Sequence, residues 1–148
     1  MKRWSLIFPF LMILAGIAYG QGLEVVDKQD AYQASISETL QIPVRVRNSS
    51  DKPQTMIIRK APSDADGFQK GYFCLGRNCM EQSVGEFAKR IEPGETLDLY
   101  YTLETGLVAG PANLRFEISI KGLPHVAIHN INVQIDQKRE ATFVFQSR

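Results

Sequence analysis

Apolar and polar residues alternate along most of this chain, with the two-residue period of β-strands whose two faces meet different environments. The alternation is clearest over residues 40–46, where Leu, Ile and Val are separated by Gln, Pro and Arg, and it recurs over residues 96–103 and 113–121. No segment shows a convincing helical period, so we expect an all-β protein. Less regular apolar runs predict further strands at residues 23–26, 55–60, 72–74 and 125–135.

Turn-forming residues separate the predicted strands, at residues 48–53, 91–95, 106–111 and 122–124, and residues 61–71 read as a polar loop. Seven to eight short strands at this spacing predict an antiparallel immunoglobulin-like sandwich, with a closed barrel as the alternative. The Cys–Trp–Cys core of antibody domains is missing, because the only tryptophan is Trp4. Pro43 has no backbone N–H to donate, so its side of the strand at 40–46 should be an open edge or a bulge.

The first twenty residues have the three parts of a secretory signal peptide. Lys2 and Arg3 precede an apolar run over residues 4–17, and the small residues of Ala-Tyr-Gly at 18–20 form a cleavage site before Gln21. A membrane-anchoring helix is the alternative, but the run is short and Pro9 interrupts it. No second apolar stretch is long enough to cross a membrane. We therefore expect an exported protein with a signal peptide at 1–20, a sandwich domain at 21–136 and a C-terminal extension at 137–148.

The charge balance is close to neutral. The chain has 17 basic and 16 acidic residues, and loss of Lys2 and Arg3 with the signal peptide leaves 15 basic residues. Nucleic-acid-binding domains are usually strongly basic, so nucleic acid is not an expected partner. Four basic residues on two predicted strands could still form a basic strip, although a solvated outer face explains them equally well: Arg45, Arg47, Arg59 and Lys60.

The only two cysteines, Cys74 and Cys79, lie five positions apart. In an exported β-protein this spacing favours a local disulfide. A thioredoxin-like couple has two intervening residues at a helix start, and structural zinc needs four ligands, so redox and metal roles are less favoured alternatives. The bridge should stabilise the fold by only about 2 kcal/mol, because the loop that it closes is short. The main effect of the bridge should be to hold a rigid, projecting turn that can contact a partner. The turn consists of Leu75, Gly76, Arg77 and Asn78.

Other candidate sites are weak, and no catalytic, metal-binding or cofactor-binding residue is predicted. His125 and His129 fall on a predicted strand, where residues four apart stand about 13 Å from each other. A mononuclear copper or zinc site using Cys, His and Met80 remains a minor alternative. Asp64 and Asp66 near Gly67 have the spacing of a calcium loop but lack its distal glutamate, which favours a solvated turn. Serine-nucleophile, zinc-protease and phosphate-loop motifs do not occur.

Several short motifs stand out between residues 24 and 121: Cys-x4-Cys at 74–79, Ser83, Pro-Gly-Glu at 93–95, Tyr-Tyr at 100–101, Gly110 before Leu-Arg-Phe-Glu-Ile at 114–118, and Asn-Ser-Ser at 48–50. As a set they resemble immunoglobulin-like domains of exported Bacteroidota proteins. The resemblance implies a sandwich fold and export, and no catalytic residue. Many such proteins carry a C-terminal sorting domain for type IX secretion; none follows in this sequence, so we expect a periplasmic location over the cell surface or the medium.

The C-terminal extension combines a charged hinge at 137–140 with the β-prone run Ala-Thr-Phe-Val-Phe at 141–145. This run either pairs within its own sandwich or adds to the open sheet edge of a partner, with Phe143, Val144 and Phe145 in contact. These observations predict an exported, non-enzymatic sandwich that acts through protein contacts as an accessory subunit of a cell-envelope or secretion assembly. The alternatives are a module that binds carbohydrate or a small ligand through Phe68, Tyr72 and Tyr100, and a small enzyme.

Overall fold

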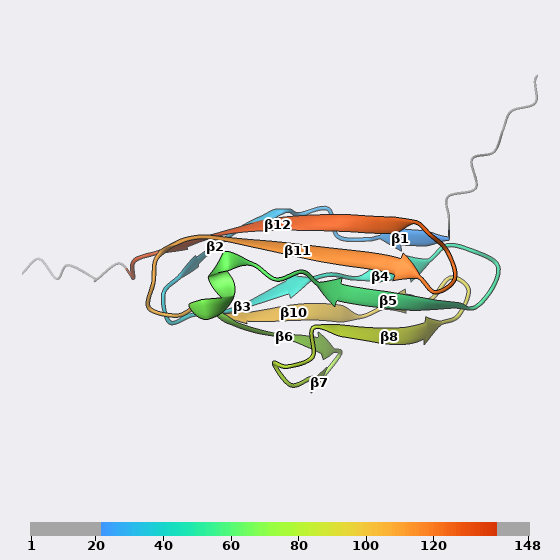
Figure 1. Cartoon of the computed structure of the whole chain (residues 1–148), viewed down its shortest axis with the longest axis horizontal. Helices are drawn as coiled ribbons and strands as arrows, with labels where there is room; N and C mark the ends of the chain where they lie inside the picture. The colour runs from blue at the N-terminus through green and yellow to red at the C-terminus, as the bar shows by residue number, and fades with distance from the viewer. Residues whose placement is uncertain (1–21, 139–148) are drawn as a thin grey trace, which may run out of the picture.

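The computed structural model describes residues 22–138, and Figure 1 shows the path of the chain. The predicted signal peptide and the β-prone run at 141–145 lie outside the described residues. Within residues 22–138 no helix is long and apolar enough to cross a membrane. The described elements are the strands β1 (Leu23–Val25), β2 (Ala31–Ser35), β3 (Thr39–Pro43), β4 (Val46–Asn48), β5 (Gln54–Lys60), β6 (Lys70–Leu75), β7 (Asn78–Cys79), β8 (Glu86–Ile91), β9 (Thr96–Leu97), β10 (Leu99–Glu104), β11 (Gly110–Ile120) and β12 (Val126–Asp136), with the short 3-10 helix η1 (Asp64–Gly67).

The strands form two facing layers, which confirms the predicted immunoglobulin-like sandwich (Figure 1). One layer is a five-stranded sheet of order β2-β12-β11-β5-β8. The other joins the sheets β1-β4-β9 and β3-β10-β6-β7, because β3 leads directly into β4 and β9 into β10. All pairings are antiparallel except that of β2 with β12. The barrel alternative is wrong, because the described strands make separate sheets with open edges.

Several elements differ from the sequence predictions. The strand predicted at 40–46 is interrupted, because the N–H of Arg45 donates to the side chain of Asp27 instead of to a neighbouring strand. The strand predicted at 96–103 is interrupted at Asp98. The strands β2, β7 and β8 were not predicted. All three are edge strands with mostly exposed or half-buried residues, so their apolar alternation is weak.

Pro43 lies at an open edge, as predicted. The N–H of Val44 donates to the carbonyl of Leu99 over 2.9 Å, and the N–H of Thr105 donates to the carbonyl of Glu38 over 2.8 Å. Alternate residues of a strand direct their backbone groups to opposite sides. The even-numbered residues of β3 therefore face β10, and Pro43 faces the open side, where its missing N–H costs no ladder bond.

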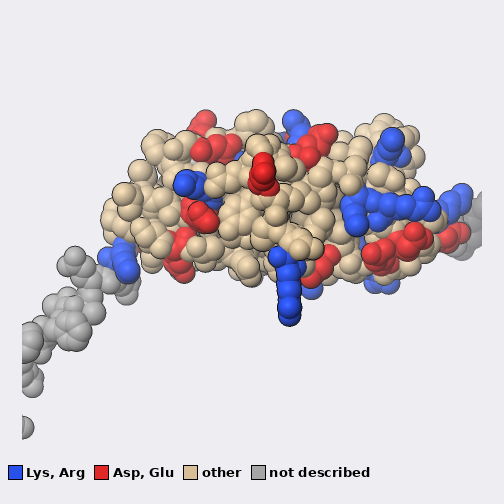
Figure 2. Space-filling model, turned by 90° about the horizontal axis from the view of Figure 1, so that it is seen from below, with Lys and Arg blue, Asp and Glu red and all other residues tan. Residues whose placement is uncertain are grey.

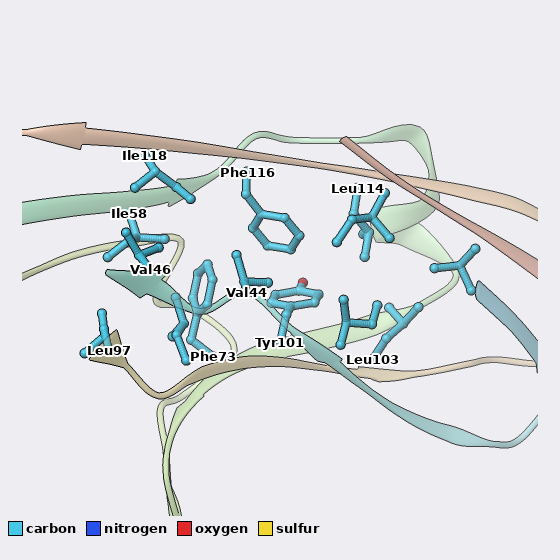
Figure 3. Close-up of a cluster of buried hydrophobic side chains, with 14 of the residues drawn as sticks. Val44, Val46, Ile58, Phe73, Leu97, Tyr101, Leu103, Leu114, Phe116 and Ile118 are labelled. Carbon is cyan, nitrogen blue, oxygen red and sulfur yellow. The ribbon is translucent and has the colours of Figure 1, made fainter. Parts of the chain in front are cut away.

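An aromatic cluster fills the space between the layers (Figure 3). The ring of Phe73, on β6, is completely buried and lies edge-on against Tyr101 and Phe87, both at 5.2 Å between ring centres, and against Phe116 at 6.0 Å. Phe116 comes from the opposite layer. The cluster therefore links the two sheets through one contiguous set of rings.

The N-terminal part of the chain crosses from one layer to the other between β1 and β2, and Asp27 secures this crossing. Its buried carboxylate accepts the backbone N–H of Arg45 at 2.8 Å and the Arg45 Nη2 at 2.7 Å. Burial raises the pKa of Asp27, but the bonds from Arg45 outweigh it and hold the pKa below its ordinary value. The aspartate therefore stays ionised and keeps its bonds to mildly acidic pH.

His129 is expected to make the stability of the fold depend on pH in the mildly acidic range. Its Nε2 is buried without a hydrogen-bond partner among residues 22–138, and burial lowers the pKa of the imidazole below 6.5. Because the folded-state pKa is the lower one, stability is fully present above about pH 6.5 and falls as the pH drops below it. We expect the urea midpoint to decline from pH 7 to pH 5 in the wild type and less in His129→Phe. His125→Phe, at an exposed position, should decline like the wild type. Equal declines in all three proteins would contradict this role.

Candidate functional site

The two cysteines form the predicted disulfide. Cys74 on β6 and Cys79 on β7 are direct cross-strand partners with their Cα atoms 3.9 Å apart. Cys74 is buried, and its Sγ lies 3.5 Å from the hydroxyl of Thr102, whereas Cys79 is exposed. Neither cysteine is free, so the pair is oxidised and serves as a structural bridge.

The bridge closes a small hairpin that projects from the sandwich, as β7 does in Figure 1. The turn is tight because Gly76 adopts a φ of 56°, which glycine reaches without strain. The N–H of Gly76 donates to the carbonyl of Asp98, and that of Met80 to the carbonyl of Phe73. Arg77 and Asn78 at the tip are exposed. The hairpin is thus held at the disulfide and by hydrogen bonds at both ends, with two polar side chains presented outward.

Two tyrosines lie beside the disulfide on the outer face of the same sheet. Tyr100 on β10 is the cross-strand partner of Cys74 on β6 and of Pro43 on β3. Two residues further along the same strands, Thr102 on β10 pairs with Tyr72 on β6. Because Phe73 and Tyr101 point into the core, their neighbours Tyr72 and Tyr100 point outward. The tyrosines are diagonal neighbours, at a distance of about 7–8 Å between Cα atoms. We call this surface the tyrosine–disulfide face; it comprises Pro43, Tyr72, Cys74, Cys79 and Tyr100.

Phe68, the third aromatic candidate, is not on this face. It lies just after η1, next to the start of β6, and its side chain is 59% exposed. It lines a shallow hollow together with Val108. The tyrosine hydroxyls already have acidic partners: Tyr72 donates to Glu104 over 3.3 Å, and a hydrogen bond with Asp98 raises the pKa of Tyr100. A partner would therefore contact the ring faces of the two tyrosines and not their hydroxyl groups.

A polar cleft of about 370 Å³ opens at the side of the sandwich between the start of β6 and the chain entering β8. Tyr101 and Lys60 line it, and both side chains are more than nine-tenths buried. The Tyr101 hydroxyl lies so close to Gly71 that a Cβ on that residue would stand 2.0 Å from the oxygen. Burial raises the pKa of Tyr101, so the hydroxyl is a hydrogen-bond donor at neutral pH.

The predicted basic strip does not form, because its members lie on different sheets. Arg45 precedes β4 in one layer, whereas Arg59 and Lys60 belong to β5 in the other. Arg45, Arg59 and Lys60 are also paired, with Asp27, Glu117 and Asp66 respectively. Figure 2 shows both signs of charge intermixed around a broad uncharged area on the face in view. This face offers no extended basic surface for a polyanion.

The other polar candidates have local partners. Asp66 accepts hydrogen bonds from the backbone and hydroxyl of Ser63 and from the Lys60 Nζ, so it serves to close the turn of η1. His125 is exposed before β12, and His129 is half-buried within it. Among residues 22–138 no three His, Cys, Asp or Glu side chains are grouped closely enough to hold a metal ion.

Exposed apolar side chains form a feature that was not predicted from the sequence. Three cluster near the turn between β11 and β12, where the strand prediction at 125–135 did not say which side chains face outward. They are Leu123, Val126 and Ile128, each between 44% and 48% exposed.

Comparison with known proteins shows the fold and not a family. No family model matches the chain, and no curated protein matches its sequence. The CooA pilin subunit from enterotoxigenic Escherichia coli superposes with a TM-score of 0.50 at 8% identity, over 80% of this chain and 99% of the pilin. E. coli alpha-2-macroglobulin gives 0.51 at 14% identity, over 78% of this chain and 7% of its own. A family 123 glycoside hydrolase from Clostridium perfringens gives 0.50 at 8% identity, over 73% of this chain and 23% of the hydrolase. This chain therefore spans only a small part of the last two proteins.

Proposed function

We propose that this protein is an exported, non-enzymatic sandwich that acts through protein contacts, as an accessory subunit of a cell-envelope or secretion assembly. The observation that carries the proposal is the tyrosine–disulfide face with its rigid hairpin. Aromatic rings and a preformed projecting turn give contact area at a low cost in conformational entropy. No described residue set suggests catalysis, a metal or a cofactor.

Export and a periplasmic location rest on three supports. Residues 1–20 have the composition of a signal peptide, and the Cys74–Cys79 bridge suits an oxidising compartment. The resemblance to exported Bacteroidota domains points the same way. The pilin subunit is a further support, since a fold of this kind there belongs to a subunit of an assembly.

Two segments provide the proposed contacts. The first is the hairpin turn, with Leu75, Gly76, Arg77 and Asn78. The second is the β-prone run at 141–145, with Phe143, Val144 and Phe145, which adds as a strand to a sheet edge.

The test is a pull-down of the tagged, signal-cleaved protein from envelope fractions, with mass spectrometry of the bound proteins. We expect one consistent envelope protein with the wild type, loss of it with the double change Arg77→Ala and Asn78→Ala, and retention with Gln134→Ala on the opposite face. A consistent partner that the hairpin variant still binds would contradict the role of the hairpin.

The disulfide variants separate binding from stability. Replacing both cysteines with serine should lower the free energy of unfolding by about 2 kcal/mol, because only a short loop is released. It should also reduce partner binding, since the turn is no longer held rigid. Chemical denaturation and the same pull-down measure the two effects. Full partner binding in a merely destabilised protein would show that the bridge does not shape the contact.

The two tyrosines together favour a second candidate function, which is carbohydrate binding by stacking of sugar rings on Tyr72 and Tyr100. A glycan array with the wild type and with Tyr100→Ala separates the two functions. Tyrosine-dependent glycan binding, together with no protein in the pull-down, would replace the first proposal with this one.

A further inference from the structure

The strand β8 is an open edge of the five-stranded sheet. It pairs with β5 on one side, and no strand of the described region pairs with its other side. Figure 2 views the molecule from the side on which β6 and β8 lie, at the bottom of Figure 1. An unpaired strand of this length is a template for another strand.

The hydrogen-bonding pattern shows which backbone groups face outward. The N–H of Lys60 donates to the carbonyl of Gly85 over 2.9 Å, so odd-numbered residues of this segment face β5. Glu86, Ala88 and Arg90 therefore direct their N–H and carbonyl groups to the open side. Three residues with six unpaired groups can accept a strand of about five residues.

The surroundings of this edge suit an extended apolar segment with a polar end. Phe87 is only half-buried on the core side, where it packs against Phe73. The polar cleft adjoins the edge at Gly85, and it holds the Tyr101 hydroxyl and the Lys60 ammonium group. Lys60 uses two of its protons on Asp66 and the carbonyl of Ala61, which leaves one for an incoming acceptor.

The chain itself contains a segment with these properties. Residues 141–145 are uncharged and β-prone, and Glu140 and Gln146 flank them. If this run paired with β8, one of these two acceptor side chains would stand at the cleft end of the strand, whichever way the added strand ran.

Residues 141–145 of the same molecule cannot lie along this edge as a full strand. Across the sheet, Glu86 of β8 pairs with a residue of β5 whose other partner is Glu117 of β11, and Glu117 pairs in turn with Ile128 of β12. Glu86 is therefore level with Ile128, which lies eight residues before Asp136 in β12. That offset is about 26 Å along the strands. The five steps from Asp136 to residue 141 span at most about 18 Å. The donor must therefore come from another molecule.

We propose that residues 141–145 of one copy add as a strand to β8 of a second copy, which gives head-to-tail assembly. The interface is heterologous, so it generates chains or rings instead of closing as a dimer. This inference rests on the proposed role of the C-terminal segment as a strand donor. It is independent of the tyrosine–disulfide face.

Two variants of the signal-cleaved protein test the assembly. Ala88→Pro removes an N–H that faces the open side, where proline is tolerated, and deletion of residues 141–148 removes the donor. Gln41→Pro is the matched control, because Gln41 shares the open side of β3 with Pro43. By sedimentation velocity we expect concentration-dependent association of the wild type and of Gln41→Pro, with at least about tenfold weaker association of Ala88→Pro and of the deletion.

Mixing the two deficient proteins gives the decisive result. Ala88→Pro retains the donor and the deletion retains the acceptor, so the mixture should form a one-to-one complex and stop there. A monomeric wild type, or a mixture without a complex, would overturn the inference. Binding of an envelope protein through Arg77 and Asn78 would survive either outcome, so failure here is distinguishable from failure of the proposed function.

Discussion

Phe73→Ala should lower the free energy of unfolding by about 3–5 kcal/mol, the loss typical of truncating a fully buried aromatic side chain. The side chain is completely buried and contacts rings from three other strands, including Phe116 of the opposite layer. Its removal leaves a cavity between two sheets, which are held apart by their remaining side chains and cannot collapse into it.

Urea denaturation of Phe73→Ala and of Phe68→Ala measures this effect against a matched control. Phe68 is 59% exposed, so its loss should change the stability by less than about 0.5 kcal/mol. Similar losses in the two variants would show that the aromatic cluster does not link the layers.

Asn48→Ala should cost about 2–4 kcal/mol, because one buried side chain joins three backbone segments. The Asn48 Nδ2 donates to the carbonyls of Lys52 at 2.7 Å and of Ile91 at 3.0 Å. The Asn48 Oδ1 accepts from the backbone and the hydroxyl of Ser50. In the alanine variant the buried carbonyl of Ile91 loses the hydrogen bond that it accepts from the Asn48 side chain.

The neighbouring change Ser49→Ala is the control, since Ser49 is exposed. Thermal and urea denaturation of both variants should separate them by at least about 2 kcal/mol. A cost for Asn48→Ala no greater than that for Ser49→Ala would mean that the four hydrogen bonds contribute nothing net to stability.

Much of the architecture follows from local patterns. The alternation over residues 40–46 and 113–121 predicted strands that bury one face, and the turn residues predicted where the chain reverses. β8 escaped prediction because an edge strand exposes most of its side chains, and only Phe87 and Ile91 in it are large and apolar. An edge strand is identified by the strand with which it pairs, and that pairing is set by the tertiary fold and not by the local sequence pattern.

The candidate site was predictable only in part. The spacing of Cys74 and Cys79 was enough to predict the bridge, whereas the position of Tyr100 beside it depends on the register of β10 with β6. Asn48 was predicted as a turn former, but its bond to Ile91 joins residues 43 positions apart. The cleft could not be predicted, because it forms where the Tyr101 hydroxyl lies against Gly71. That contact is set by the pairing of β6 with β10 and has no signal in the sequence.

The central claim is that the disulfide hairpin contacts a protein in the cell envelope, and site-specific photo-crosslinking tests it most directly. A benzophenone amino acid placed at Arg77 should give one discrete crosslinked species in cells, and the same group at Gln134, on the outer face of the other sheet, should not. Crosslinking of equal yield and pattern at both positions, or none at Arg77, would contradict the account.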